Sequence, residues 1–303
     1  MNRRTADLPD QTGRTVLVTG ATSGLGRASA EALAAAGARV LLTARDPARG
    51  RAVAGPIGAE LVELDLADLA SVRRAAAEVR ERTGDRLDVL MANAGVMGTP
   101  PLATVDGFEL QIGTNHLGHA ALTWLLMPAL RTGPASRVVV VSSLAHRGGG
   151  LDLDDLHFRR RPYRPGTAYS QSKLANLLFA AELDRRLKAA GDPVIAVAAH
   201  PGMTDTELLA NSLRRRGRVW GWLATPVNAL ATQPLAQGVL PQLYAATAPG
   251  LTGGEYIGPG GLGEMRGRPA PARRSAAAQD RGSARRLWAV TAAETGVTPD
   301  PGA

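Results

Sequence analysis

Six short runs of aliphatic residues, separated by amphipathic helical stretches, recur along the first two thirds of this 303-residue chain. Runs so rich in β-branched residues are typical of strands that are covered on both faces, and intervening helices make neighbouring strands parallel. The pattern therefore predicts a doubly wound α/β fold, with helices on both faces of a mostly parallel sheet. The runs are residues 15–18, 40–42, 61–64, 87–91, 138–141 and 194–199.

A polar, glycine-rich or reactive segment follows each run, and ligands of open parallel sheets bind at the carboxyl ends of the strands. The first run leads into Gly20, Gly24 and Gly26. This spacing favours a sharp turn and a close approach of the next helix to a pyrophosphate, which the helix N-terminus would stabilise. Asp65 follows the third run, and either an adenine contact or an ordinary turn cap explains it.

Local signals predict helices over residues 26–37, 69–82, 108–130 and 168–187. Asp68 is the expected N-cap of the second and Gly84 its stop. An apolar stripe on the last helix indicates core or a subunit contact. A seventh strand is expected at 254–257, and the Pro- and Gly-rich residues 258–271 are expected to form an irregular loop.

Tyr169 and Lys173 are the most distinctive pair, because the chain has only two lysines among 35 basic residues. Positions i and i+4 share one face of a helix. An ammonium group beside a tyrosine lowers the phenol's pKa from about 10, which would prepare it for proton transfer. The alternative is a stray lysine on an exposed helix.

Length and composition favour a single domain at 14–303 after an N-terminal tail at 1–13, with a lid around 203–247 and a C-terminal loop and helix at 258–303. The chain has no cysteine and no apolar run of membrane-spanning length, so a cytoplasmic protein without a membrane span is expected. A thiolate metal site is excluded, and no metal is expected. The net charge of +8 reflects scattered arginine clusters, such as 159–161 and 214–216, which favour solvated loops over a nucleic-acid site.

The motifs together resemble those of the short-chain dehydrogenase/reductase family in order and spacing. They are Thr19-Gly-x-x-x-Gly-x-Gly26, Asn93-Ala-Gly95, Asn115, Ser143, Tyr169-x-x-x-Lys173 and Pro201-Gly202. Residues 114–119, 141–146 and 169–176 look like the retinol-dehydrogenase-like and protochlorophyllide-reductase-like branch, and 254–269 resemble its bacterial members. The resemblance implies a Rossmann-type, mostly seven-stranded parallel sheet.

The resemblance also implies the site. Tyr169 would be the acid/base, Ser143 would hydrogen-bond the substrate oxygen in preference to Ser142, Lys173 would lower the tyrosine's pKa and hold the ribose, and Asn115 would anchor a water. The implied cofactor contacts are Gly20, Thr22, Ser23, Gly24, Leu25, Gly26, Arg45, Asp65, Leu66, Asn93, Ala94, Gly95, Tyr169, Lys173, Pro201, Gly202, Thr204 and Thr206.

NADP(H) is the expected cofactor. Ala44 occupies the place where NAD-specific relatives carry an acid, and Arg45 can bind a 2′-phosphate. The competing interpretation is that Arg45 is one more surface arginine and binds no phosphate.

The expected reaction interconverts a carbonyl and an alcohol on a bulky, apolar small molecule. Trp220 and Trp222 are the candidate substrate residues, although core, a subunit surface or a membrane contact also explains the apolar segment around them. Reduction of a carbon–carbon double bond and a dinucleotide-sensing regulator stay as alternatives. The family resemblance implies a homodimer or homotetramer.

Overall fold

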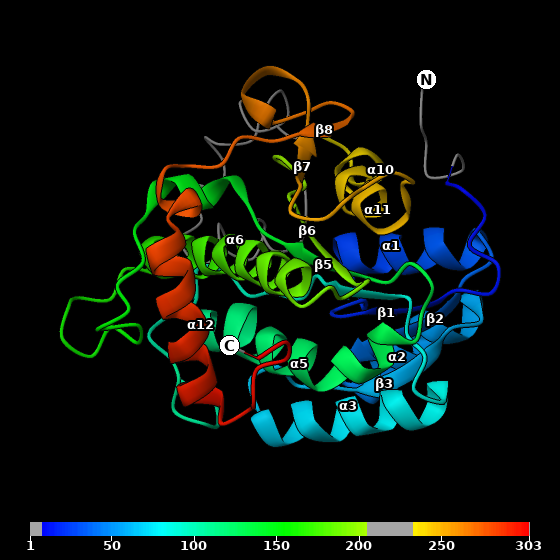
Figure 1. Ribbon diagram of the computed structural model, residues 1–303, viewed down its shortest axis with the longest axis horizontal. Helices are drawn as coiled ribbons and strands as arrows, with labels where there is room; N and C mark the ends of the chain where they lie inside the picture. The colour runs from blue at the N-terminus through cyan, green and yellow to red at the C-terminus, as the bar shows by residue number, and fades with distance from the viewer. Residues whose placement is uncertain (1–7, 205–232, 303) are drawn as a thin grey trace.

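The computed structural model describes residues 8–204 and 233–302. They form one eight-stranded sheet in the order β3-β2-β1-β4-β5-β6-β7-β8 (Figure 1). The first seven strands are all parallel, and β8 pairs antiparallel with β7. The strands are β1 (Thr15–Val18), β2 (Arg39–Ala44), β3 (Glu60–Glu63), β4 (Val89–Ala92), β5 (Arg137–Val141), β6 (Ile195–Ala199), β7 (Tyr256–Pro259) and β8 (Pro269–Pro271).

Helices cover both faces of this sheet, which confirms the predicted fold class (Figure 1). One face packs on α3 (Leu69–Thr83), α5 (Gly118–Arg131) and α6 (Pro165–Ala189), with α12 (Arg281–Thr295) outside them. The other face packs on α1 (Gly24–Ala35), α2 (Pro47–Ala54) and α11 (Leu240–Thr247). The shorter helices are η2 (Gly55–Ile57), α4 (Leu110–Ile112), the π-helix η3 (Gly113–Leu117), η4 (Leu144–Gly148), α10 (Leu235–Gly238), η5 (Leu262–Glu264) and η6 (Ala277–Gln279).

The expected helix signals mark real boundaries. The Asp68 carboxylate accepts a hydrogen bond from Ala70 N, and α3 ends at Gly84, which adopts the left-handed conformation. The long helix that carries the Tyr/Lys pair begins at Pro165, three residues earlier than expected. Leu174, Leu177 and Leu178 of its apolar stripe are buried in the core.

The prediction of an irregular loop over residues 258–271 is wrong at both ends. Gly258 and Pro259 continue β7, and β8 returns antiparallel to pair with it. Two of the three β8 residues are prolines, which argue against a strand in sequence alone. An edge position tolerates them, and only the tertiary structure reveals that edge. No helix of the described residues is long and apolar enough to cross a membrane.

Candidate active site

A cleft of about 1400 Å³ lies at the carboxyl ends of the strands. Most of the residues singled out in the sequence line it, although they come from the segments that follow six different strands and from α6. They are Gly20, Thr22, Ser23, Gly24, Leu25, Gly26, Arg45, Asp65, Leu66, Asn93, Ala94, Gly95, Ser143, Tyr169, Lys173, Pro201, Gly202 and Thr204. Thr206, Trp220 and Trp222 lie outside the described residues.

The glycine turn between β1 and α1 leaves no room for a side chain at Gly20 or Gly26. Gly20 has φ +67°, and a Cβ there would lie 2.7 Å from the Cβ of Ala94. A Cβ on Gly26 would lie 2.5 Å from Nδ2 of Asn93. The turn can therefore bring its backbone amides and the start of α1 directly to an anionic group in the cleft.

Thr19 joins this turn to the end of β4. Its Oγ1 accepts hydrogen bonds from the backbone N–H groups of Asn93, at 2.9 Å, and Ala94, at 3.0 Å. Nδ2 of Asn93 donates in return to the carbonyl of Thr19, at 2.8 Å. Two loops that are far apart in sequence are thus held as one wall of the cleft.

Asn115 lies in the π-helix, fully buried behind Gly95 rather than in the cleft lining. Its Oδ1 accepts from Val96 N at 2.8 Å, and its Nδ2 donates to Val96 O and to Ser172 Oγ, both at 2.9 Å. The side chain therefore fixes the loop after β4 against α6. Any contact of this residue with the cleft is left to its backbone.

The histidine one turn further on, His119, was not anticipated from sequence. Its Nδ1 lies 3.0 Å from Asn115 O and its Nε2 lies 2.9 Å from Thr19 Oγ1. A carbonyl only accepts, so Nδ1 carries the proton and Nε2 accepts from the threonine hydroxyl. Burial lowers the pKa of His119 to about 4, which keeps the ring neutral. The side chain thereby joins the π-helix to the glycine turn.

Tyr169, Ser143 and Lys173 lie together in the cleft lining. Burial raises the pKa of Tyr169 to about 12, and a hydrogen bond with the Ser143 hydroxyl offsets this only in part. Burial lowers the pKa of Lys173 to about 8, and Nζ donates to Val141 O at 3.0 Å.

The role of Lys173 in lowering the pKa of Tyr169 stays a prediction. Lys173 Nζ lies 5.8 Å from the centre of the Tyr169 ring, and desolvation of the phenol dominates. Burial of this kind depends on the tertiary structure and has no sequence signal.

The two neighbouring serines have different partners. Ser142 is buried, and its hydroxyl donates to Lys173 O at 2.8 Å, inside α6. Ser143 caps the short helix η4, where its Oγ accepts from Ala145 N at 3.2 Å. Since the Ser143 hydroxyl also reaches Tyr169, the second serine is the one beside the tyrosine.

Charged side chains of the cleft lining gather where β2 and β3 end. Arg45 follows β2, and Arg49 lies four residues later on α2. Asp46 between them caps α2 by accepting from Ala48 N and Arg49 N. Arg49 was missed in sequence, although an arginine three residues after a capping aspartate was a readable signal. Asp65 accepts from Ala67 N at 2.9 Å, so it caps its own turn while it lines the cleft.

The end of the cleft beside Tyr169 is lined by uncharged side chains, apart from Lys173. They come from the loop after β4, from the start of η4, from the first turn of α6 and from the loop after β6. The set is Val96, Met97, Pro100, Leu102, Leu144, Ala145, Pro165 and Met203.

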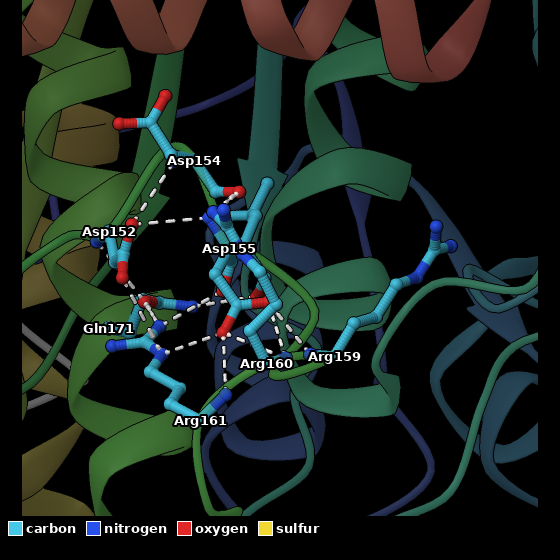
Figure 2. A network of polar contacts seen from close by, with 8 residues as sticks. Asp152, Asp154, Asp155, Arg159, Arg160, Arg161 and Gln171 are labelled. Carbon is cyan, nitrogen blue, oxygen red and sulfur yellow. Dashed lines mark hydrogen bonds and ion pairs between the residues drawn. The ribbon is translucent and has the colours of Figure 1, made fainter.

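The long loop between Ser143 and Tyr169 is ordered around one carboxylate (Figure 2). Asp155 accepts from the backbone N–H groups of Arg159, Arg160 and Arg161. The Arg161 guanidinium lies 4.0 Å from the centre of the Phe158 ring and also reaches Gln171 on α6. Residues 159–161 were expected to be a freely solvated cluster, and for Arg161 that expectation is wrong. The loop ends at Pro165, on the rim of the cleft.

The fold and this cleft define a nicotinamide-dependent oxidoreductase. The model of the short chain dehydrogenase family matches residues 14–217, and the chain belongs to this family. It is 43% identical to the polyprenol dehydrogenase of Mus musculus over 93% of this chain and 84% of that one, and 40% identical to retinol dehydrogenase 13 of Homo sapiens over 94% and 85%. A crystal structure of a putative uncharacterized protein from Mycobacterium Paratuberculosis is 45% identical, with a TM-score of 0.82 and 98% of each chain covered.

These relatives support the coarser part of the expected function. The chain is a short-chain dehydrogenase of the retinol-dehydrogenase-like branch, which binds a nicotinamide dinucleotide and acts as an oxidoreductase on carbonyls and alcohols.

Proposed function

We propose that the protein is an NADP(H)-dependent oxidoreductase that interconverts a carbonyl and an alcohol on a bulky, apolar substrate. The observation that carries the proposal is the convergence of Tyr169, Ser143 and Lys173 at the uncharged end of a cleft whose other end carries two arginines.

The dinucleotide fits the residues present. Gly20 and Gly26 allow the turn to pack closely against Ala94 and Asn93, where a Cβ would collide, and Gly24 leaves open space beside the turn for a pyrophosphate. The ribose and nicotinamide end would be held by Lys173, Pro201, Gly202 and Thr204, which line the same cleft. When bound, the dinucleotide supplies or accepts the hydride.

The chain's own residues handle the proton. Because its pKa is raised, Tyr169 holds a proton at neutral pH and can give it to a carbonyl oxygen, while the Ser143 hydroxyl orients that oxygen. Lys173, with a pKa of about 8, exchanges protons close to neutral pH and can resupply the tyrosine. Asn115 holds the loop after β4 in place behind them.

The preference for NADP(H) rests on Arg45 and Arg49. Among the described residues that line the cleft, the one acidic side chain is Asp65, which caps its own turn, and the residue that ends β2 is the buried Ala44. Asp46 is engaged in capping α2. Two guanidinium groups at this end favour a 2′-phosphate over a free hydroxyl.

The substrate class rests on the apolar lining beside Tyr169 and on the names of the relatives, a polyprenol and a retinol dehydrogenase. Among the described residues at this end of the cleft, Lys173 is the one cation, so the carboxylate of an oxo-acid has no other side chain with which to form an ion pair. A long apolar chain would instead bury the apolar lining away from water, which favours binding.

The test is turnover of long-chain and small charged carbonyl compounds with NADPH, followed by product analysis. Apolar aldehydes or ketones should be consumed fastest and recovered as alcohols. Recovery of a saturated carbonyl from an unsaturated one would replace the proposal by alkene reduction, and dinucleotide binding without any turnover would replace it by sensing.

A further inference from the structure

A buried histidine supports the loop after β6. His200 precedes Pro201, and its Nδ1 lies 3.1 Å from the backbone nitrogen of Gly202. Since that N–H can only donate, Nδ1 accepts, and the proton of the neutral ring is on Nε2. Nε2 lies 3.2 Å from Oε2 of Glu264 and donates to it. One ring orientation and one tautomer satisfy both bonds.

Glu264 connects this histidine to two other segments. Its Oε2 also pairs with the Arg147 guanidinium, at 2.6 Å. Arg147 lies on η4, the short helix that Ser143 caps. Its Oε1 accepts from Arg273 N at 2.9 Å. The carboxylate side chain is only 14% exposed. A single carboxylate thus links the helix that begins at Ser143 to the loop that follows β6.

His200 is buried and closely packed. A Cβ on Gly258 of β7 would run into the imidazole ring, and the Tyr256 ring centre lies 5.1 Å from that of His200. Next to Glu264, the carbonyl of Met265 accepts from Met203 N at 2.9 Å. Residues 264–265 therefore lie directly against the loop 201–204.

Glu264 lies outside residues 14–217, which the family model matches. We propose that Glu264, acting through His200, is a positioning residue that holds the backbone of residues 201–204 in the shape that receives the nicotinamide end of the dinucleotide. The inference rests on the proposed cofactor placement, and it assigns a role in the site to the segment between β7 and β8.

The test compares two ligands that differ only at the nicotinamide end, NADPH and 2′-phospho-ADP-ribose. In Glu264→Gln, the amide NH₂ must face either His200 and Arg147 or the backbone N–H of Arg273, so the bridge that supports the His200 ring loses one of its two ends. His200→Leu removes the acceptor for Gly202 N. Each variant should weaken NADPH binding about tenfold, the effect of one lost hydrogen bond, and leave 2′-phospho-ADP-ribose unchanged.

A variant that restores the hydrogen bond to Gly202 N distinguishes a positioning role of His200 from a general loss of structure. An asparagine can accept from the N–H two residues on, so His200→Asn should bind NADPH within about threefold of wild type. If Glu264 acts through the histidine, adding Glu264→Gln to His200→Asn should cost nothing more. The control is Asp154→Asn, which breaks an exposed ion pair with Arg286 at 3.0 Å far from the loop.

Equal weakening of both ligands in Glu264→Gln, or an additive double variant, would overturn the inference. NADH and ADP-ribose are measured alongside. If the protein prefers NADH, the proposed NADP(H) preference is wrong. The loss of NADH binding relative to ADP-ribose binding in Glu264→Gln then decides the role of Glu264.

Discussion

At the scale of single residues, the two ends of the cleft carry different side chains. Arg45 and Arg49 lie beyond the end of β2, and Ser143, at the end of β5, lies beside Tyr169 and Lys173 of α6. Most of these residues were predicted from sequence because each directly follows a predicted strand or stands at i, i+4 on a helix. His119 and Glu264 were missed because their partners, Thr19 and His200, lie far away in the chain, whereas Arg49 was missed although its capping aspartate is a local signal.

Tyr169→Phe removes one hydroxyl and should lower kcat by about 10²–10⁴-fold, the usual share of general acid–base catalysis. Dinucleotide affinity should stay close to wild type, because the ring is retained. Single-turnover rates with NADPH, and NADPH fluorescence titration, measure the two quantities. A variant that keeps more than about a tenth of the rate would show that another group transfers the proton.

Arg45→Ala and Arg49→Ala should each weaken NADPH binding about tenfold or more, the effect of losing a charge-assisted hydrogen bond, and leave NADH binding nearly unchanged. The matched control is Arg51→Ala, an exposed arginine on the same helix that does not line the cleft. Titration of both dinucleotides measures the ratio. An equal loss for NADPH and NADH would mean that the arginines do not recognise the 2′-phosphate.

The buried Lys173 makes the stability of the ligand-free protein depend on pH. Its pKa is about 8 when folded and 10.5 as the reference value, so between these values the unfolded chain binds more protons. Stability contributed by this residue therefore rises with pH from about 8 to 10.5. In denaturant titrations, the free energy of unfolding of wild type should rise relative to that of Lys173→Met between about pH 8 and pH 9.5. A constant difference would show that the lysine is not desolvated.

At the scale of elements, the π-helix before α5 sets how closely that helix approaches the loop after β3. Gly118 follows the π-helix with φ −61°, and a Cβ there would collide with the carbonyl of Leu66. Capping signals predicted the bounds of α3, whereas α2 and α11 were not predicted. The π-helix was not predicted, because the extra residue in its turn is retained by tertiary contacts such as those of Asn115 and His119.

Gly118→Ala should therefore lower the free energy of unfolding by about 1–3 kcal/mol, as overpacking does. The control is Gly55→Ala, at φ −55° with open space around it, which should stabilise by about 0.4–1 kcal/mol through the unfolded state. Thermal and urea unfolding measure both. Equal effects of the two substitutions would contradict the close approach at Leu66.

At the scale of the whole molecule, α12 packs from outside on the helices α5 and α6, which cover one face of the sheet. Its Trp288 lies 4.9 Å from Trp124 of α5 and 5.5 Å from Phe179 of α6 between ring centres. Thr291 hydrogen-bonds His116 of the π-helix at 2.9 Å. The fold class was predicted, but this clamp was not, because the contacts join residues more than 100 positions apart. The cytoplasmic location and the homodimer or homotetramer stay predictions.

Trp288→Ala should cost about 3–5 kcal/mol of unfolding free energy, as loss of a buried aromatic side chain does. The exposed Val105, at 80%, is the control, because Val105→Ala should change stability by no more than about 0.5 kcal/mol. Urea titration followed by circular dichroism measures both. A small effect at Trp288 would show that α5 and α6 hold together without α12.

The last strand also decides how copies of this protein can meet. Gly260 N donates to Arg268 O, and Ala272 N donates to Tyr256 O, so by alternation the backbone nitrogens of Pro269 and Pro271 point away from β7. Proline has no backbone N–H, so this edge lacks hydrogen-bond donors at those positions. The opposite edge strand, β3, carries Glu60 and Glu63. Both edges of the sheet thus disfavour pairing with a strand of another molecule. Fibril-like stacking is disfavoured, and assembly is left to helices and loops.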